Sequence, residues 1–363
     1  MKRQFTTILA FGLLSQAAFA LDASNFKVSG ALDLGTDSYF NTEESKLHNS
    51  FYSTFDLLFS VQFDKKWSAE AAITADGDNT APEFAYDGAF VQYTLADDIF
   101  FRAGDMTYAE GAFKFYLYDD TGDFAAGMKD ISLRGVEANF KGLTLAIGLT
   151  EYTSPSGSNV DENGGEDPSI SAYDIHIAYD LVLGGQTFRP FFNYMSYQTA
   201  TENQLKTGVV AKLVFGPAEI QAVYGLYGFA LGEDEPALTH TFAFEPTIQL
   251  GKVSILASVY YAMLDEDAPY EAEEIPEYFF GYIEPGYAFT DKFSIGIPVE
   301  YHTNSLDEDT DLETFVVGPS LYYNVTETLA LSAYANVTLP IGDDYGDNDD
   351  AIFGFGTEVE FSF

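Results

Sequence analysis

The chain has 363 residues, a formal net charge of −41, no cysteine, 33 phenylalanines and 25 tyrosines. This excess of acid argues against binding to nucleic acid, or to an anionic lipid surface, through a basic patch. The lack of cysteine excludes both a disulfide framework and a lipid-anchoring cysteine. A disordered acidic chain would lack so many aromatic residues, so a folded protein is indicated, and a secreted soluble β-protein stays open as an alternative.

The first residues have the features of an export signal. Lys2 and Arg3 precede an apolar run at 8–14, and Ala18 and Ala20 place small residues where a signal peptidase cleaves. We therefore expect residues 1–20 to be removed and residues 21–363 to form one domain. Beyond residue 21, charged or polar residues interrupt every apolar run before it reaches the roughly 20 residues that a membrane helix needs.

Apolar and polar residues alternate from residue 26 onward, in segments of about ten residues, which is the length of a tilted transmembrane strand. In the segment 51–63, for example, Phe55 and Phe59 alternate with Thr54 and Asp56. Short turns separate the two segments of each pair, as at 141–142. The repeated unit is therefore a β-hairpin.

Longer, acid-rich connections separate one hairpin from the next, and short and long connections alternate strictly. This rhythm predicts an all-β fold: a transmembrane, antiparallel, up-and-down barrel of about 18 strands, with 16 as the alternative. Such a sheet closes because hydrocarbon offers no partner to a free strand edge. The long connections are expected at 41–49, 77–84, 107–130, 151–170, 198–203, 229–236, 263–275, 303–311 and 338–350.

The last segment, 356–363, is predicted to close the barrel. Val359 and Phe361 alternate there with Glu358 and Glu360, so one face suits lipid and the other suits water. Its expected partner is the first strand, over 26–36.

The export signal, the alternating strands, the rhythm of turns and loops, and the terminal Phe363 together resemble Gram-negative outer-membrane β-barrels of the porin type, over the whole mature chain. The resemblance implies a place in the outer membrane of a Gram-negative bacterium, contact with its lipids, recognition of Phe363 by the barrel-assembly machinery, and a homotrimer. It also implies that the third long connection, 107–130, folds inward and narrows the channel. General porins have 16 strands, so the expected count is nearer to that of sugar-selective relatives.

The alternation within each strand also assigns charged side chains to the lumen. The bases come only from the first ten expected strands. We therefore expect one arc of the pore wall to be positive and a longer arc to be negative, and we expect the channel to prefer cations. The alternative is that these are hydrated residues with no selective role, because a wide aqueous pore screens charge. The predicted pore-lining residues are Lys27, Asp33, Asp56, Glu70, Arg102, Glu137, Asp174, Arg189, Lys206, Lys212, Glu219, Glu245, Glu284, Glu300, Glu358 and Glu360.

The connection 107–130 combines charged residues with an aromatic run at 113–118. We interpret it as a constriction in which charge sorts ions and aromatic rings stack on sugars, because connections of this length are usually functional. The alternative is an extracellular lid whose aromatic side chains pack on one another. The predicted constriction residues are Glu110, Lys114, Asp119, Asp120 and Asp123.

Two other kinds of site have weaker support. The acidic stretches 264–274, 307–313 and 343–350 have carboxylates close enough to hold Ca²⁺ or Mg²⁺, but none has the spacing of an EF-hand, so hydrated loops are preferred and no metal or cofactor is expected. Asp174 and His176 would share the lumen face, as the base and orienting residue of an outer-membrane hydrolase would. No nucleophile motif accompanies them, so an enzyme is not predicted.

The sequence therefore predicts a porin-like outer-membrane channel for passive diffusion of small hydrophilic solutes, with a preference for cations. Charge reversal at Glu245, Glu284 and Glu300 is expected to move the ion preference toward anions. A structural or adhesive barrel whose acidic loops bind a partner or divalent ions stays open as the alternative.

Overall fold

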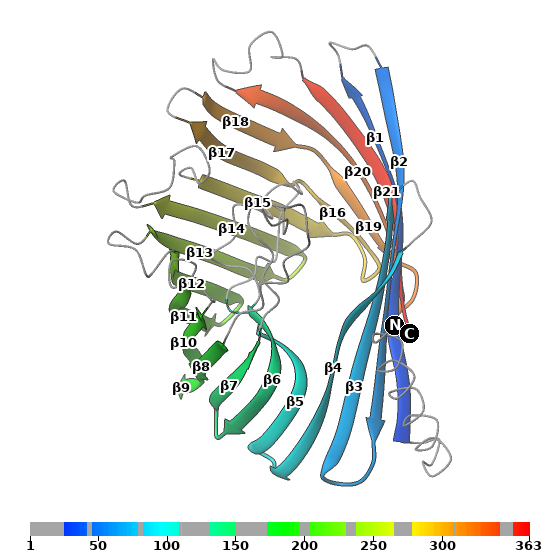
Figure 1. The fold of residues 1–363 in the computed structure, drawn as a ribbon. Helices are drawn as coiled ribbons and strands as arrows, with labels where there is room; N and C mark the ends of the chain where they lie inside the picture. The colour runs from blue at the N-terminus through cyan, green and yellow to red at the C-terminus, as the bar shows by residue number, and fades with distance from the viewer. Residues whose placement is uncertain are drawn as a thin grey trace, which may run out of the picture.

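One antiparallel sheet contains every strand of the described chain and closes on itself (Figure 1). No helix in the ranges given below is long and apolar enough to span a membrane. The computed structural model describes residues 25–41, 46–78, 83–108, 110, 131–149, 173–196, 203–229, 237–264, 278–307, 310–341 and 351–363.

The sheet has 21 strand segments. In chain order they are β1 (Phe26–Asn41), β2 (Lys46–Gln62), β3 (Trp67–Asp78), β4 (Glu83–Ala96), β5 (Ile99–Tyr108), β6 (Ile131–Phe140), β7 (Leu143–Leu149), β8 (Tyr173–Tyr179), β9 (Leu181–Leu183), β10 (Gln186–Ser196), β11 (Gln204–Phe215), β12 (Ala218–Phe229), β13 (Ala237–Leu250), β14 (Val253–Leu264), β15 (Tyr278–Ala288), β16 (Phe293–Gly296), β17 (Val299–Asp307), β18 (Thr310–Val317), β19 (Ser320–Asn324), β20 (Leu329–Ile341) and β21 (Ile352–Ser362).

Three pairs of consecutive segments each form one strand of the wall. β8 and β9 both pair with β10, β16 and β17 both pair with β15, and β18 and β19 both pair with β20. Pro298 and Pro319 interrupt two of these strands, because proline has no N–H to donate to the ladder. The barrel therefore has 18 strands, which confirms the predicted count and excludes the alternative of 16.

The barrel closes where β21 pairs with β1, from Ala31 opposite Ser362 to Asn41 opposite Ile352. Beyond that ladder, the N–H of Gly30 donates to the carbonyl of Phe363 at 3.1 Å, and the N–H of Phe363 donates to the carbonyl of Gly30 at 3.1 Å. The predicted pairing of the last strand with the first is thus confirmed.

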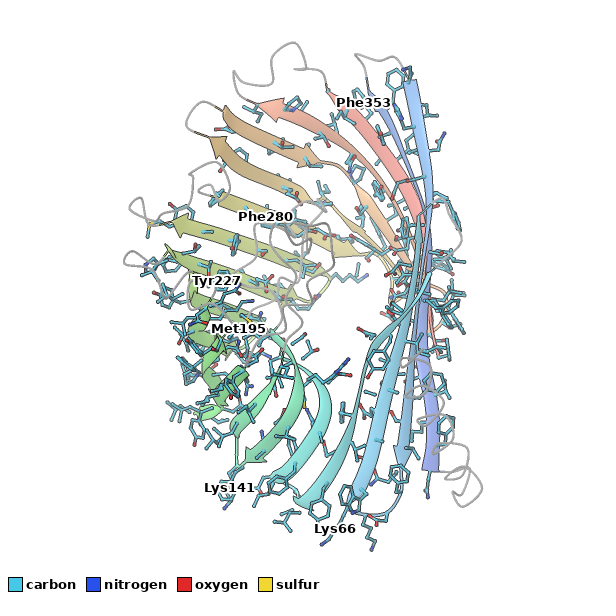
Figure 2. All side chains as sticks on the ribbon, viewed as in Figure 1. Lys66, Lys141, Met195, Tyr227, Phe280 and Phe353 are labelled. Carbon is cyan, nitrogen blue, oxygen red and sulfur yellow. The ribbon has the colours of Figure 1, made fainter. Side chains whose placement is uncertain are left out.

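Successive side chains point to opposite faces of the wall, as they must in a strand. Large apolar side chains such as Phe51, Phe244 and Phe361 are exposed on the outer face, which is the face that lipid covers in a transmembrane barrel. Figure 2 shows side chains on both faces, with Lys66 and Lys141 at the end of the barrel that carries the short turns.

The short turns have the geometry that tight hairpins need. Lys141 and Gly142 have φ angles of 50° and 87°, and positive φ at both central residues is characteristic of a two-residue type I′ turn. In the turn before β3, the carboxylate of Asp64 accepts the N–H groups of Lys66 at 2.7 Å and Trp67 at 2.9 Å. These backbone hydrogen bonds lower the pKa of Asp64 from its ordinary value.

Several predicted long connections are shorter in the structure. β1 runs to Asn41 rather than 36, and β2 begins at Lys46, so the first connection is not 41–49. The expected connections at 77–84 and 303–311 shrink in the same way, because ladder pairing continues through Asp78, Asp307 and Thr310. Polar residues remain in strands here because both neighbouring strands are long enough to pair with them.

The height of the wall varies around the barrel. β2 has 17 residues, whereas β7 has 7. Figure 1 shows long strands β1–β3 on one side and short strands β5–β9 on the low side. The contact between His176 and Glu110 lies on this low side.

Candidate functional site

The charged residues predicted for the lumen all lie at inner-face positions of their strands. Ladder register establishes this, because directly paired residues share a face: Asp33 pairs with Glu360 and Arg102 with Glu137. Those that are exposed or half-buried are Lys27, Asp33, Asp56, Glu70, Arg102, Arg189, Lys206, Lys212, Glu219, Glu358 and Glu360. Those that are buried are Glu137, Asp174, Glu245, Glu284 and Glu300.

Glu110, just beyond the end of β5, lies against the inner wall and is only 3% exposed. Its carboxylate oxygens Oε1 and Oε2 accept the Nε–H of Arg189 at 2.9 and 3.0 Å. His176 Nε2 lies 3.4 Å from Glu110 Oε1, and Arg189 Nη1 donates to Asp180 Oδ1 at 2.9 Å. We call these four residues, Glu110, His176, Arg189 and Asp180, the latch.

The latch holds Glu110 against β8 and β10, on the lumen side. Of the predicted constriction residues, Glu110 is therefore placed at the inner wall. Lys114, Asp119, Asp120 and Asp123 lie outside the described residues.

The charge of Glu110 is stabilised by its partners. Burial alone would raise the pKa of this carboxyl group, but His176 and the guanidinium of Arg189 outweigh burial and hold the pKa below its ordinary value. Glu110 is therefore an anion at neutral pH, and the latch is a charge-assisted contact.

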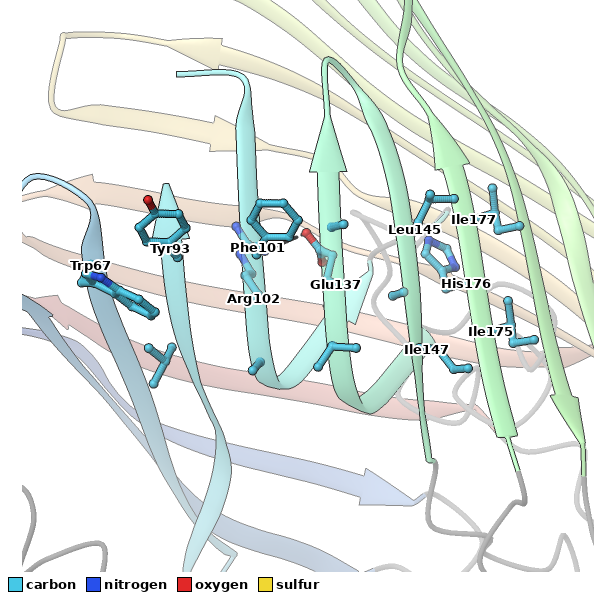
Figure 3. Close-up of a pocket in the computed structure, with 15 residues that line it drawn as sticks. Trp67, Tyr93, Phe101, Arg102, Glu137, Leu145, Ile147, Ile175, His176 and Ile177 are labelled. Atoms are coloured by element: carbon cyan, nitrogen blue, oxygen red, sulfur yellow. Dashed lines mark ion pairs between the residues drawn. The ribbon is translucent and has the colours of Figure 1, made fainter. Parts of the chain in front are cut away.

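The latch continues into a second group of contacts on β5 and β6. The Tyr108 ring stacks on His176 with 4.0 Å between ring centroids, and the Tyr108 hydroxyl donates to Glu137 Oε2 at 2.7 Å. Glu137 also lies 3.9 Å from Arg102 Nη1 (Figure 3). Charged and aromatic side chains thus form one connected network from Arg102 to Arg189.

Asp174 and His176 do share the inner face, as the hydrolase alternative required, and both are fully buried. His176 packs between Tyr108 and Glu110. These contacts give it a role in the latch rather than the orientation of a hydroxyl nucleophile, so the geometry does not favour catalysis.

Three predicted pore acids on β13, β15 and β17 are buried rather than open to water: Glu245, Glu284 and Glu300. Glu284 accepts the hydroxyls of Tyr282 at 2.5 Å and Tyr322 at 2.9 Å. Glu245 accepts Ser258 Oγ at 3.2 Å. We call these three carboxylates the buried acid patch.

A different group of acids is accessible on β21, β1 and β2. Asp56 and Glu360 are exposed, and Asp33 and Glu358 are half-buried. Asp33 lies directly opposite Glu360 in the ladder, and Glu358 is two residues before Glu360 on the same face. We call these four residues the open acid arc. Of the accessible bases, Lys27 shares β1 with this arc, and Arg102, Arg189, Lys206 and Lys212 lie elsewhere on the wall, on β5, β10 and β11.

The inner wall also carries an apolar cluster that the sequence pattern did not reveal. It includes Phe191, Val210, Tyr260 and Phe280, all buried. The overlooked signal is the apolar doublet: in pairs such as Phe279-Phe280, one residue faces outward and the next must be apolar on the inner face. Apolar doublets therefore indicate where the inner wall is packed rather than wet.

Metal binding gains no support from the structure. Among the described residues, no group of three or more histidine, aspartate or glutamate side chains could hold a metal ion. Most of the acidic stretches 264–274, 307–313 and 343–350 lies outside the described residues.

Replacing Glu110 with glutamine is expected to weaken the latch. The amide keeps the size of the side chain but loses the charge, and a hydrogen bond to a charged group contributes about 2 kcal/mol. We expect larger or more variable single-channel conductance in a planar bilayer. Glu70→Gln is the matched control, because it removes an inner-wall carboxylate on β3, away from the latch.

The contacts of Glu110 in the latch also predict how the conductance depends on pH. Because the pKa of Glu110 is lowered, the latch is fully formed at any pH above the range in which glutamate ordinarily titrates. It is lost only as the pH falls through the lowered pKa of Glu110. The difference in conductance between the wild type and Glu110→Gln should therefore stay constant from neutral pH through that range and change only in stronger acid. A change between pH 7 and 5 that is present in the wild type and disappears in Glu110→Gln would contradict this assignment, because it would place the titration of Glu110 above its ordinary range.

Comparisons with known proteins find the same fold at low sequence identity. The outer membrane protein OmpT of Vibrio cholerae, in its in-vitro folded trimer form, matches with a TM-score of 0.54 and 12% identity over 93% of this chain and 99% of that one. OpdL of Pseudomonas aeruginosa matches with a TM-score of 0.60 and 10% identity, over 94% and 99%. OccK8 (OprE) of the same species matches with 0.57 and 11%, over 94% and 98%.

No model of a protein family matches the chain, and no curated protein matches it. The evidence for the resemblance is therefore structural. By that similarity the chain has the fold of Gram-negative outer-membrane β-barrels of the porin type, which confirms the predicted resemblance.

Proposed function

We propose that this barrel is a channel for passive diffusion of small hydrophilic solutes, with a preference for cations. The observation that carries the proposal is a closed barrel of 18 strands whose inner face bears accessible charge, above all the open acid arc. A barrel of this size is wide enough for an aqueous path, whereas one of about eight strands is filled by its own side chains.

Selectivity among ions would come from the electric field of the charged side chains on the inner wall. The open acid arc gathers four carboxylates on three neighbouring strands; one accessible base, Lys27, shares β1 with it, and the other accessible bases lie on β5, β10 and β11. Clustered charge of one sign raises the local concentration of counter-ions, so cations would enter more readily than anions. Solutes would otherwise be sorted by size, and no chemical step is involved.

The biological setting extends the proposal. Residues 1–20 would direct export, Phe363 would be read by the barrel-assembly machinery, and lipids of the outer membrane would surround the mature chain. The trimer form of the structurally similar OmpT supports a homotrimer.

Single-channel recording of the purified chain in a planar bilayer tests the function. We expect stable steps of conductance, a reversal potential on the cation side in a salt gradient, and block by some members of a panel of sugars. Silence across many insertions of correctly folded protein would overturn the channel and favour a structural or adhesive barrel. An anion-side reversal potential would remove the cation preference alone.

A further inference from the structure

Two tyrosine side chains lie along the inner wall on either side of the place where the barrel closes. Tyr334 projects from β20, and its hydroxyl donates to Asp37 two strands away, on β1 (Figure 1). Tyr52 projects from β2 in the opposite direction, and its hydroxyl end interacts with Glu358, two strands away on β21. Because neighbouring strands are about 4.8 Å apart, each side chain must lie along the wall to reach such a partner.

The strand position that each tyrosine ring crosses is a glycine. Gly35 on β1 pairs with Tyr52, and Gly356 on β21 pairs with Tyr334. A Cβ added at Gly35 would overlap Cζ, Cε1 and Oη of Tyr52 almost equally, so this ring turns its face to the wall. A Cβ added at Gly356 would lie 2.5 Å from Tyr334 Cε1. Both tyrosines are half-buried, so the side of each ring that is turned from the wall is open to the lumen. We call the two rings the tyrosine platform.

Carboxylates surround the tyrosine platform. Asp37 and Glu358 lie at the hydroxyl ends of the rings, and Asp33 and Glu360 are direct ladder partners on the same two strands and the same face. Oδ1 of Asp33 is buried and has no hydrogen-bond partner among the residues that the structure describes. A carboxylate oxygen can only accept, so this atom is available to a cation or a donor that the chain does not itself supply.

Other rings of the inner wall differ in what covers them. Tyr39 and His48, nearer the loop end of β1 and β2, stack on each other with 4.6 Å between ring centroids and 8° between their planes. On β4 and β5, the guanidinium of Arg102 lies 5.0 Å from the centroid of Phe90 and 4.7 Å from that of Phe100. The chain therefore places its own cation on those two phenylalanine rings, whereas the tyrosine platform is bordered by carboxylates.

We propose that the tyrosine platform binds small organic ammonium ions, and that these ions are a substrate class of the channel. The inference rests on the proposed function, because the ligand reaches the platform through the lumen. The face of an aromatic ring attracts a cation, and the neighbouring carboxylates attract the same charge. An alkylammonium ion presents both a charge and an apolar surface, so it gains from the rings and from the acids. A neutral sugar gains nothing from the charge of the acids, and a small inorganic cation retains its water in place of the rings.

Choline and its neutral isostere 3,3-dimethyl-1-butanol test the proposal on wild-type channels in KCl. The two molecules have nearly the same shape, and only choline is charged. We expect choline to interrupt the KCl current in a concentration-dependent way, and the isostere at the same concentration to leave it unchanged. Equal interruption by the two compounds would show sorting by size alone and would overturn the proposal.

Two double variants test the part played by the rings. Tyr52→Leu with Tyr334→Leu should weaken the choline effect about tenfold, because a cation on an exposed ring gains a factor of roughly three from each. Tyr52→Phe with Tyr334→Phe keeps the ring faces and should retain most of the effect. Phe100→Leu is the matched control, since it removes an inner-wall ring that Arg102 already covers. An undiminished choline effect in the leucine variant would overturn the proposal.

The proposal and the channel can fail separately. A wild-type protein that conducts KCl but does not respond to choline would overturn the choline site and leave the channel intact. If the folded barrel does not conduct, calorimetric titration of the wild type in detergent with choline and with the isostere reads the platform directly. Heat from choline alone would then support the site, and no heat from either compound would overturn it.

Discussion

Neutralising the open acid arc is expected to abolish most of the cation preference of the channel. The variant carries Asp33→Asn, Asp56→Asn, Glu358→Gln and Glu360→Gln. These side chains keep their size, so the pore should keep its width while four accessible negative charges are lost. The reversal potential in a salt gradient should move toward the anion side.

The size of this effect follows from screening. Unit charges 4 Å apart in water interact by about 1 kcal/mol, and physiological salt screens charges over about 8 Å. An arc of four charges should thus change the relative barrier for cations and anions by roughly 0.6 kcal/mol or more, which is about a threefold change in permeability ratio. Recording at low salt should enlarge the shift, and recording at 1 M salt should suppress it.

The buried acid patch supplies the control. Glu284 is held by two tyrosine hydroxyls and is 7% exposed, so its charge lies apart from the aqueous path. Glu284→Gln should therefore move the reversal potential less than Glu360→Gln, although both remove one charge. For the same reason, charge reversal at the buried residues Glu245, Glu284 and Glu300 should move the ion preference toward anions by less than equal changes in the open acid arc would. An unchanged reversal potential in the fourfold arc variant would show instead that lumen charge is hydrated and has no selective role.

The sequence predicts much of this fold because lipid on one side and a lumen on the other impose a period of two on every strand. That period is enough to place Glu245 and Glu360 alike on the inner face. It does not distinguish them, because burial depends on what packs against the inner wall. Glu245 is 2% exposed beside Ser258, whereas Glu360 is exposed, and nothing in the alternation separates the two.

The latch shows a second limit. Glu110 is readily predicted as a constriction residue from the composition of its connection, but its partners His176 and Arg189 are 66 and 79 positions away in sequence. Tyr86 shows a third, since the β-bulge at Gly88 breaks the alternation that would assign this side chain to a face of the wall. Long-range pairing and local irregularity are the two features that a periodic pattern cannot contain.

Loss of the terminal aromatic ring is expected to prevent accumulation of the barrel in the outer membrane. The barrel closes where β21 pairs with β1, a junction that we call the seam. There Phe363 forms two backbone hydrogen bonds with Gly30, and its ring stacks on Phe361 at 5.8 Å between centroids. Phe363→Ala retains the backbone bonds and removes only the ring, whereas deletion of Phe363 removes both. Comparing the two separates a role in the seam from a role as an assembly signal.

The energetics of the seam decide what each role predicts. Removing the ring costs at most about 3 kcal/mol, the value for full burial of a phenylalanine, and here the ring is 49% exposed. A ladder of this length between β1 and β21 should survive that loss, so Phe363→Ala should fold into lipid vesicles without any assembly factor. In cells, however, it should be nearly absent from the outer membrane if the ring is the recognised signal.

Phe361→Ala is the matched control, because it removes an outward ring from the same strand two residues earlier. It should fold in vesicles as Phe363→Ala does, yet accumulate in cells close to the wild-type level, measured as the fraction of heat-modifiable protein in isolated outer membranes. Normal accumulation of Phe363→Ala would remove the assembly role of the terminal ring. Failure of Phe363→Ala in vesicles as well would assign the defect to the seam, because no assembly machinery is present there to read a signal.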